Sequence, residues 1–251
     1  LGGVFLKGWC AMNGMLCIHG FTGSPREIEP LVSFLNNQTN WLIRTPVLPG
    51  HGDELKLKGV RYSDWIRHAE EELVKLMEQC DTIYICGFSM GGLIGSWLAT
   101  QYPVKKMVLL SAAAYYMNPR NFLLEMQNMI SECLTNSFRH STIFQKYKRK
   151  FTSTPLKAYL EFRKLVNTIR PIFSKVNVPT LIVQGKMDPI VPLKSAYFLY
   201  ESINTPEKKL LLLEEANHHI CYCQEQQRVF QEIFTFLNEE DTCKKIAMTA
   251  N

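Results

Sequence analysis

Short apolar runs alternate with amphipathic stretches of helical period along most of the chain. Six runs have the length of buried strands, at residues 15–19, 41–45, 82–86, 106–111, 179–184 and 208–213. Between them, apolar residues recur three or four positions apart, the spacing of one face of a helix. These stretches cover residues 24–37, 63–78, 90–101, 193–203 and 224–237. The alternation predicts an α/β fold with a mostly parallel sheet and helices on both faces.

The first helix carries a recognisable start signal. Ser24 precedes Pro25, and Glu27 follows three residues after Ser24. Serine is favoured as an N-cap, proline at the first helical position, and glutamate where its side chain can bond back to the cap. We therefore predict a helix that begins at Pro25 and is capped by Ser24.

The stretch 82–104 has no charged residue and is long enough to cross a bilayer. However, it contains Gly87, Gly91, Gly92 and Gly95, and it changes from β-branched to helical residues in its middle. A buried strand, a glycine turn and a buried helix explain this pattern better than a membrane span. We expect no stable membrane insertion.

Residues 112–175 interrupt the alternation. They contain helical patterns at 122–134 and 156–169 but no convincing strand, and they hold 11 Lys/Arg against 3 Glu. The sequence thus predicts a core of residues 1–111 and 176–241, an inserted helical cap at 112–175 and a tail at 242–251. The excess of basic residues is typical of a solvated helical face. A sharper hypothesis is attraction of anionic substrates or of an anionic membrane surface.

Composition narrows the class of protein without defining its function. The 251 residues are 46% apolar and 20% charged, which excludes a disordered, collagen-like or coiled-coil chain. Eight scattered cysteines without a CxxC pair suggest reduced thiols. The first 20 residues lack a recognisable signal. We therefore expect a cytoplasmic protein, and the net charge of +5 gives little reason to expect a nucleic-acid partner.

The candidate nucleophile lies directly after the third predicted strand. Residues 87–91 read Gly-Phe-Ser-Met-Gly, which fits G-x-S-x-G between a predicted strand and a predicted helix. This context holds the serine on a sharp turn, where glycines two residues to either side avoid clashes. Ser89 is therefore the predicted nucleophile. The alternative is a buried glycine-rich turn whose serine has no catalytic role.

A serine nucleophile needs a base, and the base needs a carboxylate that orients it. Asp188 follows the strand at 179–184 and is the favoured acid, although Glu214 and Glu215 remain possible. Beyond Asp188 the only histidines are His218 and His219, which both follow the last strand. The residue pattern alone does not separate these two neighbours.

Two backbone N–H groups are expected to stabilise the oxyanion. One belongs to Met90, directly after the nucleophile, and the other to the loop after the first strand, where Phe21 is the best candidate. His19 and His51 are expected to have structural roles in their loops.

No metal or cofactor is predicted. His218, His219, Cys221 and Cys223 lie close in sequence, but adjacent histidine side chains diverge and Cys-x-Cys lacks the usual spacing of zinc ligands. The chain has no P-loop and no G-x-G-x-x-G after a strand.

Together these motifs resemble the α/β-hydrolase superfamily. The set comprises His-Gly-Phe-Thr-Gly at 19–23, Pro-Gly-His-Gly at 49–52, the serine motif, Gly-Lys-Met-Asp at 185–188 and the histidine pair. The chain is most similar to small bacterial carboxylesterases and more distantly to monoacylglycerol lipases. This resemblance implies a small helical cap after the family's sixth strand and no cofactor. It matches Ser89, Asp188, Phe21 and Met90 to the family's site, and His219 to its base, because Ile220 and Cys221 follow His219.

The resemblance implies a serine esterase that acts on short- to medium-chain acyl esters, with a small-molecule ester as its partner. A monoacylglycerol lipase or acyl thioesterase is the alternative within enzymes, and a non-catalytic ligand-binding member of the fold is the alternative from another class. Phe122, Met126 and Ile130 in the cap are candidates for an acyl pocket, although packing of the cap explains most such residues equally well.

Overall fold

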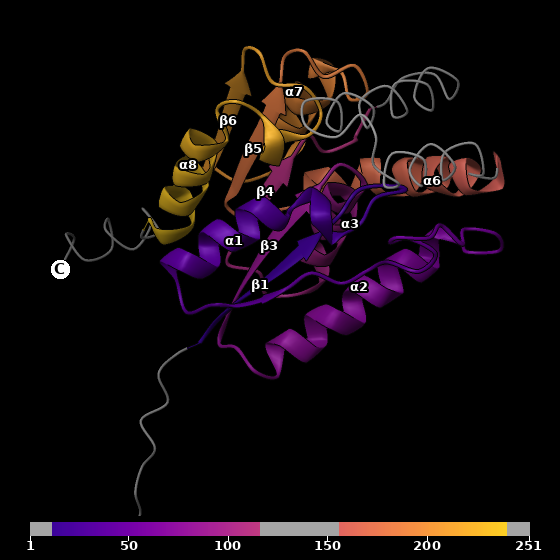
Figure 1. Cartoon of the computed structure of the whole chain (residues 1–251), viewed down its shortest axis with the longest axis horizontal. Coiled ribbons are helices and arrows are strands. Elements are labelled where there is room, and N and C mark those ends of the chain that lie inside the picture. The colour runs from indigo at the N-terminus through magenta and orange to yellow at the C-terminus, as the bar shows by residue number, and fades with distance from the viewer. Residues whose placement is uncertain (1–11, 116–155, 240–251) are drawn as a thin grey trace, which may run out of the picture.

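Six parallel strands form one sheet in the order β2-β1-β3-β4-β5-β6. The computed structural model describes residues 12–115 and 156–239, and Figure 1 shows the sheet with helices packed around it. The strands are β1 (Asn13–Ile18), β2 (Leu42–Arg44), β3 (Thr82–Phe88), β4 (Lys106–Leu110), β5 (Thr180–Gly185) and β6 (Lys208–Leu213). All six predicted strands are present, and their parallel pairing confirms the predicted fold class.

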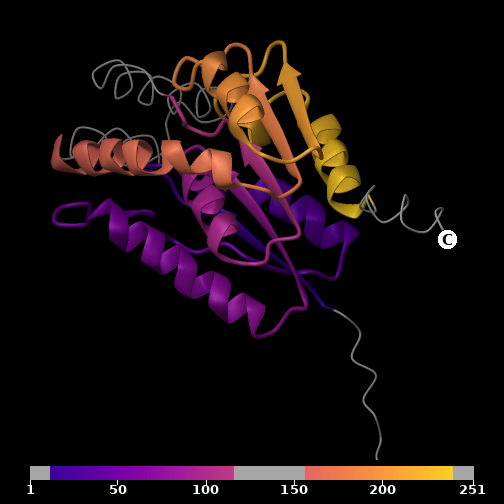
Figure 2. The same ribbon diagram turned by 180° about the vertical axis from the view of Figure 1, so that it is seen from behind.

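Helices cover both faces of the sheet, as Figures 1 and 2 show from opposite sides. α1 (Glu29–Gln38) and α8 (Gln226–Asn238) pack on one face. The other face carries α2 (Tyr62–Met77), α3 (Met90–Gln101), α6 (Leu156–Ile169) and α7 (Leu193–Ser202). β3 and α3 together account for the uncharged stretch 82–104. Within the described ranges, no helix is both long and apolar enough to span a membrane.

Alternate residues of each strand supply the two hydrophobic clusters. On β1, Leu16 and Ile18 join the cluster beneath α2 and α3, whereas Met15 and Cys17 join the cluster beneath α1 and α8. Successive side chains of a strand point to opposite faces. This explains why the predicted strands read as continuous apolar runs: the sheet is buried on both faces.

The predicted start of the first helix is partly wrong. The chain forms a short 3-10 helix, η1 (Pro25–Glu27), before α1, and Ser24 makes no side-chain capping bond. The Glu27 carboxylate instead accepts the backbone N–H of Gly20 at 2.8 Å. Glu27, which the sequence pattern assigned to a capping box, therefore stabilises the loop that follows β1.

The inserted segment 112–175 begins directly after β4, and part of it packs as core. α6 and the 3-10 helix η2 (Arg170–Lys175) bury side chains in the same cluster as α2 and α3. The predicted boundary of a separate cap at residue 175 stays a prediction. Phe122, Met126, Ile130 and the predicted helix 122–134 lie outside the described residues, as does the tail 242–251.

Three buried thiols lie together beneath the carboxyl ends of the strands. Cys17 on β1 and Cys86 on β3 are register partners, and Cys221 belongs to the same hydrophobic cluster. A hydrogen bond with Cys17, together with burial, raises the pKa of the Cys86 thiol well above its ordinary value. Burial likewise raises the pKa of Cys221. Cys86 and Cys221 therefore stay protonated, and none of the three thiols forms a disulfide.

Candidate active site

Ser89 occupies a strained turn between β3 and α3. Its φ is 52° and its ψ is −111°, a conformation that a residue with a side chain rarely adopts. Such strain persists only where the surroundings impose it, and it is common at functional sites. The side chain is largely buried, and the helix that follows directs its N-terminus at this turn.

The glycines around Ser89 are required by close backbone approach. A Cβ at Gly87 would lie 2.5 Å from the Gly91 carbonyl oxygen, and a Cβ at Gly91 would collide with the carbonyl oxygen of Ile18. The end of β1 therefore lies directly against the turn. This is the packing that the G-x-S-x-G motif predicted.

Asp188 lies in the loop after β5 and binds His218. The Nδ1 atom of His218 lies 2.8 Å from Asp188 Oδ2, and both side chains are almost completely buried. The opposite oxygen, Oδ1, accepts the backbone N–H groups of Ile190 and Val191 at 2.8 and 2.9 Å. The carboxylate is thus held from both sides in one orientation.

Gln184, which no motif in the sequence singles out, also binds this carboxylate. Its Nε2 donates to Asp188 Oδ2 at 2.9 Å and to the backbone carbonyls of Gly185 and Val191. The residue is fully buried near the end of β5. A polar residue at the end of an otherwise apolar buried strand is the signal that could have identified it, because buried polar groups need partners.

The environment of Asp188 keeps it ionised. Burial alone would raise the pKa of the carboxyl, but the charge and hydrogen bond of His218 and the two backbone donors outweigh burial and hold the pKa below its ordinary value. An ionised carboxylate only accepts hydrogen bonds, so Nδ1 of His218 carries the proton. Nε2 of a neutral His218 is then left as an acceptor.

The expectation that Asp188 pairs with His219 is wrong, because His218 holds that position. The loop after β6 docks on the loop of Asp188 through a 3.1 Å bond from the Met187 N–H to the Ala216 carbonyl. This brings residue 218 to the carboxylate, whereas His219 stacks on Phe88 at 5.4 Å between ring centroids. Burial, with a smaller effect of His218, lowers the pKa of His219 to about 3.

The loop of residues 19–23, in which the sequence predicts one oxyanion donor and which we therefore call the oxyanion loop, is built around Phe21. Phe21 is buried, and its ring stacks on Phe162 of α6 at 5.1 Å. The next residue, Thr22, has a positive φ of 62°, and Gly23 donates its N–H back to the Gly20 carbonyl. A tight turn of this kind keeps Phe21 next to the end of β1, where the carbonyl groups of Ile18 and His19 lie against Gly91 in the first turn of α3.

His19 and His51 stabilise this region, as the sequence analysis expected. His19 Nε2 accepts the Leu48 N–H at 3.0 Å, so its Nδ1 carries the proton and donates to the Gly20 carbonyl at 2.8 Å. Burial lowers the pKa of His19 to about 4, which keeps this neutral tautomer at pH 7. His51 Nδ1 lies 3.0 Å from the Pro49 carbonyl, and its ring packs beside His19.

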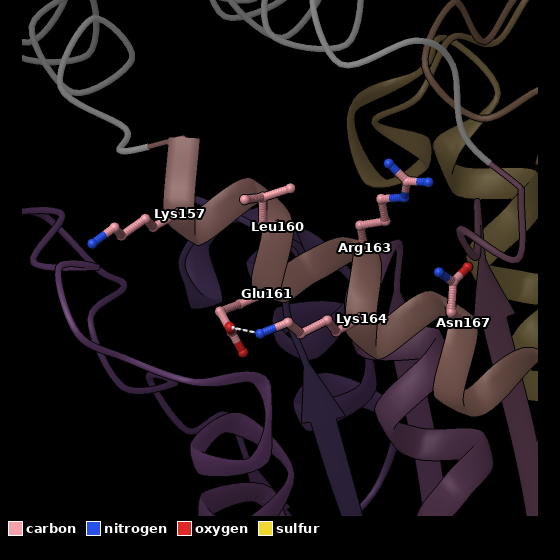
Figure 3. A pocket seen from close by; sticks show the side chains of 6 residues that line it. All are labelled: Lys157, Leu160, Glu161, Arg163, Lys164 and Asn167. Carbon is pink, nitrogen blue, oxygen red and sulfur yellow. Dashed lines mark hydrogen bonds and ion pairs between the residues drawn. The ribbon is translucent and has the colours of Figure 1, made fainter.

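A hollow of about 420 Å³ lies on the outer face of α6, away from the residues described above. Figure 3 shows its lining side chains along one side of the helix. They are Lys157, Leu160, Glu161, Arg163, Lys164 and Asn167. Lys164 pairs with Glu161 at 2.6 Å. The buried side of the same helix carries Phe162, so the hollow and the oxyanion loop lie on opposite sides of α6.

Among residues 12–115 and 156–239, no group of three or more His, Cys, Asp or Glu side chains is arranged to hold a metal ion. The arrangement that is present is a serine on a strained turn and a buried Asp–His pair at the carboxyl ends of β3, β5 and β6. Such a set supports nucleophilic attack with general-base assistance.

The fold and comparisons with known proteins define an α/β-hydrolase of the serine hydrolase class. Residues 13–226 match the family described as serine aminopeptidase, S33, and the chain belongs to that family. A thermostable monoacylglycerol lipase from Bacillus sp. (strain H-257) is 25% identical over 231 residues, which cover 89% of each chain. A carboxylesterase from Bacillus subtilis (strain 168) is 25% identical over 233 residues, which cover 91% of this chain and 94% of that protein.

The solved structures agree on the fold. The structure reported for the metagenome-derived lipolytic enzymes LipS and LipT has a TM-score of 0.74 at 22% identity. The match covers 92% of this chain and 95% of that one.

Proposed function

We propose that the protein hydrolyses carboxylic esters through a catalytic triad of Ser89, His218 and Asp188. The observation that carries the proposal is the buried hydrogen bond between Asp188 and His218, at the same end of the sheet as the strained Ser89. The ring of Phe88, which precedes Ser89, packs 4.9 Å from the ring of His218 and supports their proximity. His218 replaces His219 as the base for this reason.

The reaction proceeds in two steps. Ser89 Oγ attacks the ester carbonyl carbon while His218 Nε2 takes the hydroxyl proton, and the backbone N–H groups of Phe21 and Met90 bind the oxyanion. The C–O bond to the alcohol breaks, and the alcohol leaves with the proton from His218. A water molecule then gives a proton to His218 and attacks the acyl carbon of the acyl-enzyme. The bond from that carbon to Ser89 Oγ breaks, His218 returns the proton to Oγ, and the carboxylic acid leaves.

Asp188 stays ionised throughout and does not itself take the proton. Its hydrogen bond holds His218 in the tautomer with Nδ1 protonated and stabilises the imidazolium that forms in each step. The two backbone donors and Gln184 keep the carboxylate in place while the histidine cycles.

The substrates that we propose are short- to medium-chain acyl esters. The two relatives named carboxylesterase and monoacylglycerol lipase support an ester and do not separate the two activities. An acyl thioesterase would use the same residues. Rates on a chain-length series of p-nitrophenyl esters, monoglycerides and acyl thioesters would distinguish them. A cytoplasmic location is part of this proposal and is supported by the free thiols of Cys17, Cys86 and Cys221.

The nucleophile is tested by Ser89→Ala. Removing Oγ eliminates the covalent step, so we expect p-nitrophenyl ester hydrolysis to fall by about 10⁴-fold or more while the thermal transition remains. A fluorophosphonate probe should label the wild type at Ser89 and leave Ser89→Ala unlabelled. Ser96→Ala is the matched control, since this buried serine of α3 bonds only within its own helix and to Met107. A folded wild-type protein that is neither labelled nor active would instead support a non-catalytic ligand-binding member of the fold.

A further inference from the structure

Ser111 follows the last residue of β4, in the middle of the sheet. β4 lies between β3, which leads to Ser89, and β5, which leads to Asp188. Ser111 is completely buried, and its φ of 45° puts it in the left-handed region. A buried serine with this backbone is uncommon and requires its surroundings to impose the conformation. Neither the triad nor the oxyanion loop includes it.

The backbone on either side of Ser111 is bonded to Ser89. Phe88 and Leu110 are register partners, so Ser89 and Ser111 leave the sheet at the same level, both with positive φ. The N–H of Ser89 donates to the Leu110 carbonyl at 2.9 Å, and the Ser89 carbonyl accepts the N–H of Ala113 at 3.2 Å. The end of β4 therefore holds the backbone of the nucleophile on both sides.

The side chain of Ser111 reaches the loop that carries the base. Ser111 Oγ donates to the backbone carbonyl of His218 at 3.0 Å. The N–H of Ser111 donates to Val183 on β5 at 2.9 Å. The same His218 carbonyl also accepts the N–H of Ile220 at 3.1 Å. Because the carbonyl has this second donor, the hydroxyl is not needed to satisfy it, and its contribution is to fix where the loop lies relative to β4.

We infer that Ser111 is a positioning residue, which sets the backbone of His218 relative to Ser89 through one side-chain hydrogen bond and the backbone bonds beside it. The inference rests on the proposed triad. Proton transfer from Ser89 to His218 depends on their relative position to within a fraction of an ångström, and small misplacements reduce rate more than binding. Loss of the hydroxyl should therefore reduce kcat and leave KM nearly unchanged.

The experiment compares Ser111→Ala and Ser111→Gly with the wild type. Both remove the hydroxyl, and Gly also relieves the left-handed backbone, so it separates the hydrogen bond from strain. Ser96→Ala is again the control, because Ser96 is equally buried but bonds to the Gly92 carbonyl and not to the base loop. Active sites are counted by fluorophosphonate titration, and kcat and KM for a p-nitrophenyl ester are then expressed per labelled site, which corrects for unfolded protein.

We expect both Ser111 variants to lose about tenfold in kcat with KM within about twofold of the wild type, and Ser96→Ala to retain full kcat. The inference is overturned if both variants keep the wild-type kcat per labelled site. It is also overturned if Ser111→Gly recovers what Ser111→Ala loses, which would assign the effect to backbone strain. If the probe does not label the wild type, the proposed triad is refuted and so is the role of Ser111, which rests on it. If the wild type is labelled and active but the Ser111 variants are unaffected, only the role of Ser111 is refuted.

Discussion

Two adjacent histidines lie in environments that give them different chemistry. The Nδ1 atom of His218 is bonded to an ionised carboxylate, which leaves Nε2 of the neutral ring to accept a proton. His219 instead packs its ring on Phe88, and burial lowers its pKa to about 3, so it stays neutral and binds a proton poorly at pH 7. A general base works best when its partner stabilises the charge that it acquires.

Replacement of each histidine in turn tests this difference. His218→Ala should reduce kcat for a p-nitrophenyl ester by about 10⁴-fold, because it removes the base and leaves only the oxyanion donors and binding. His219→Gln should reduce it by less than about tenfold, through packing against Phe88 alone. Steady-state rates of both variants, with circular dichroism to check folding, provide the measurement. A larger loss in His219→Gln than in His218→Ala would return the role of base to His219.

The residues proposed here as nucleophile, acid and oxyanion donors are those that the sequence indicates, since each follows a strand in a motif whose spacing reflects a steric need. For the base, the sequence favoured His219, whereas the structure pairs Asp188 with His218. A pattern of flanking residues matched His219, but the choice depends on how the loop after β6 docks on Gly185 and Met187. Ser111 bonds to a residue distant in sequence, whereas Gln184 and Glu27 bond to loops within seven residues of them. Neither kind of bond is marked by a motif that the sequence showed.

At the scale of elements, α6 is the part of the inserted segment that packs against the oxyanion loop. Its buried side packs against α2 and α3, and the ring of Phe162 stacks on Phe21 with an interplanar angle of 16°. The ring of Trp65 in α2 also packs on Phe21, with 5.8 Å between the ring centroids. The backbone of Phe21 is thus held by two helices through its side chain.

Phe162→Leu tests whether this contact matters for catalysis. The smaller, non-planar side chain cannot stack on Phe21, so we expect kcat to fall by about three- to tenfold as the oxyanion donor loses its orientation. The matched control is Phe173→Leu in η2, an equally buried residue that packs on Phe198. Both variants should lose about 1–2 kcal/mol of unfolding free energy. Equal kcat values for the two variants, measured with a p-nitrophenyl ester, would contradict a role for the stacking.

Element positions follow closely from the hydrophobic pattern, because strands buried on both faces and amphipathic helices have different periods. The predicted strand 106–111 and the observed β4 differ by one residue, and that residue is the left-handed Ser111. The predicted side-chain cap at Ser24 is absent, since the Glu27 N–H donates to the Ser24 backbone carbonyl at 3.0 Å and the Glu27 carboxylate accepts the Gly20 N–H. Which hydrogen-bond partner a side chain such as Glu27 takes is decided by tertiary structure and cannot be read from local sequence.

At the scale of the whole molecule, buried histidines make stability depend on pH. His19 and His219 have folded pKa values of about 4 and about 3, against 6.5 when unperturbed. Below pH 6.5 the unfolded chain binds protons that the folded chain does not, so acidification favours unfolding. Asp188 has a linkage of the same sign at lower pH, because its lowered pKa stabilises the fold above its unfolded pKa of about 3.8. That stabilisation is lost only as the pH falls further, and it adds no slope between pH 5 and 7.

We therefore expect the urea midpoint to fall between pH 7 and pH 5, with each of these two histidines contributing up to about 2 kcal/mol. His219→Gln should show a smaller fall, since it removes one of the two groups and leaves His19. Equilibrium urea unfolding of both proteins at several pH values provides the measurement. A midpoint that is independent of pH in this range would show that these side chains are accessible to protons in the folded state.

The buried thiols of Cys17, Cys86 and Cys221 can report on local opening of the protein through their reaction with alkylating reagents. Because they lie beneath the strand ends that carry the active site, an alkylating reagent reaches them only when the sheet separates there. Their rate of modification in native buffer thus measures how often the catalytic end of the sheet opens. No labelling site has to be introduced by mutation, because these native cysteines already lie between β1, β3 and the loop that carries His218.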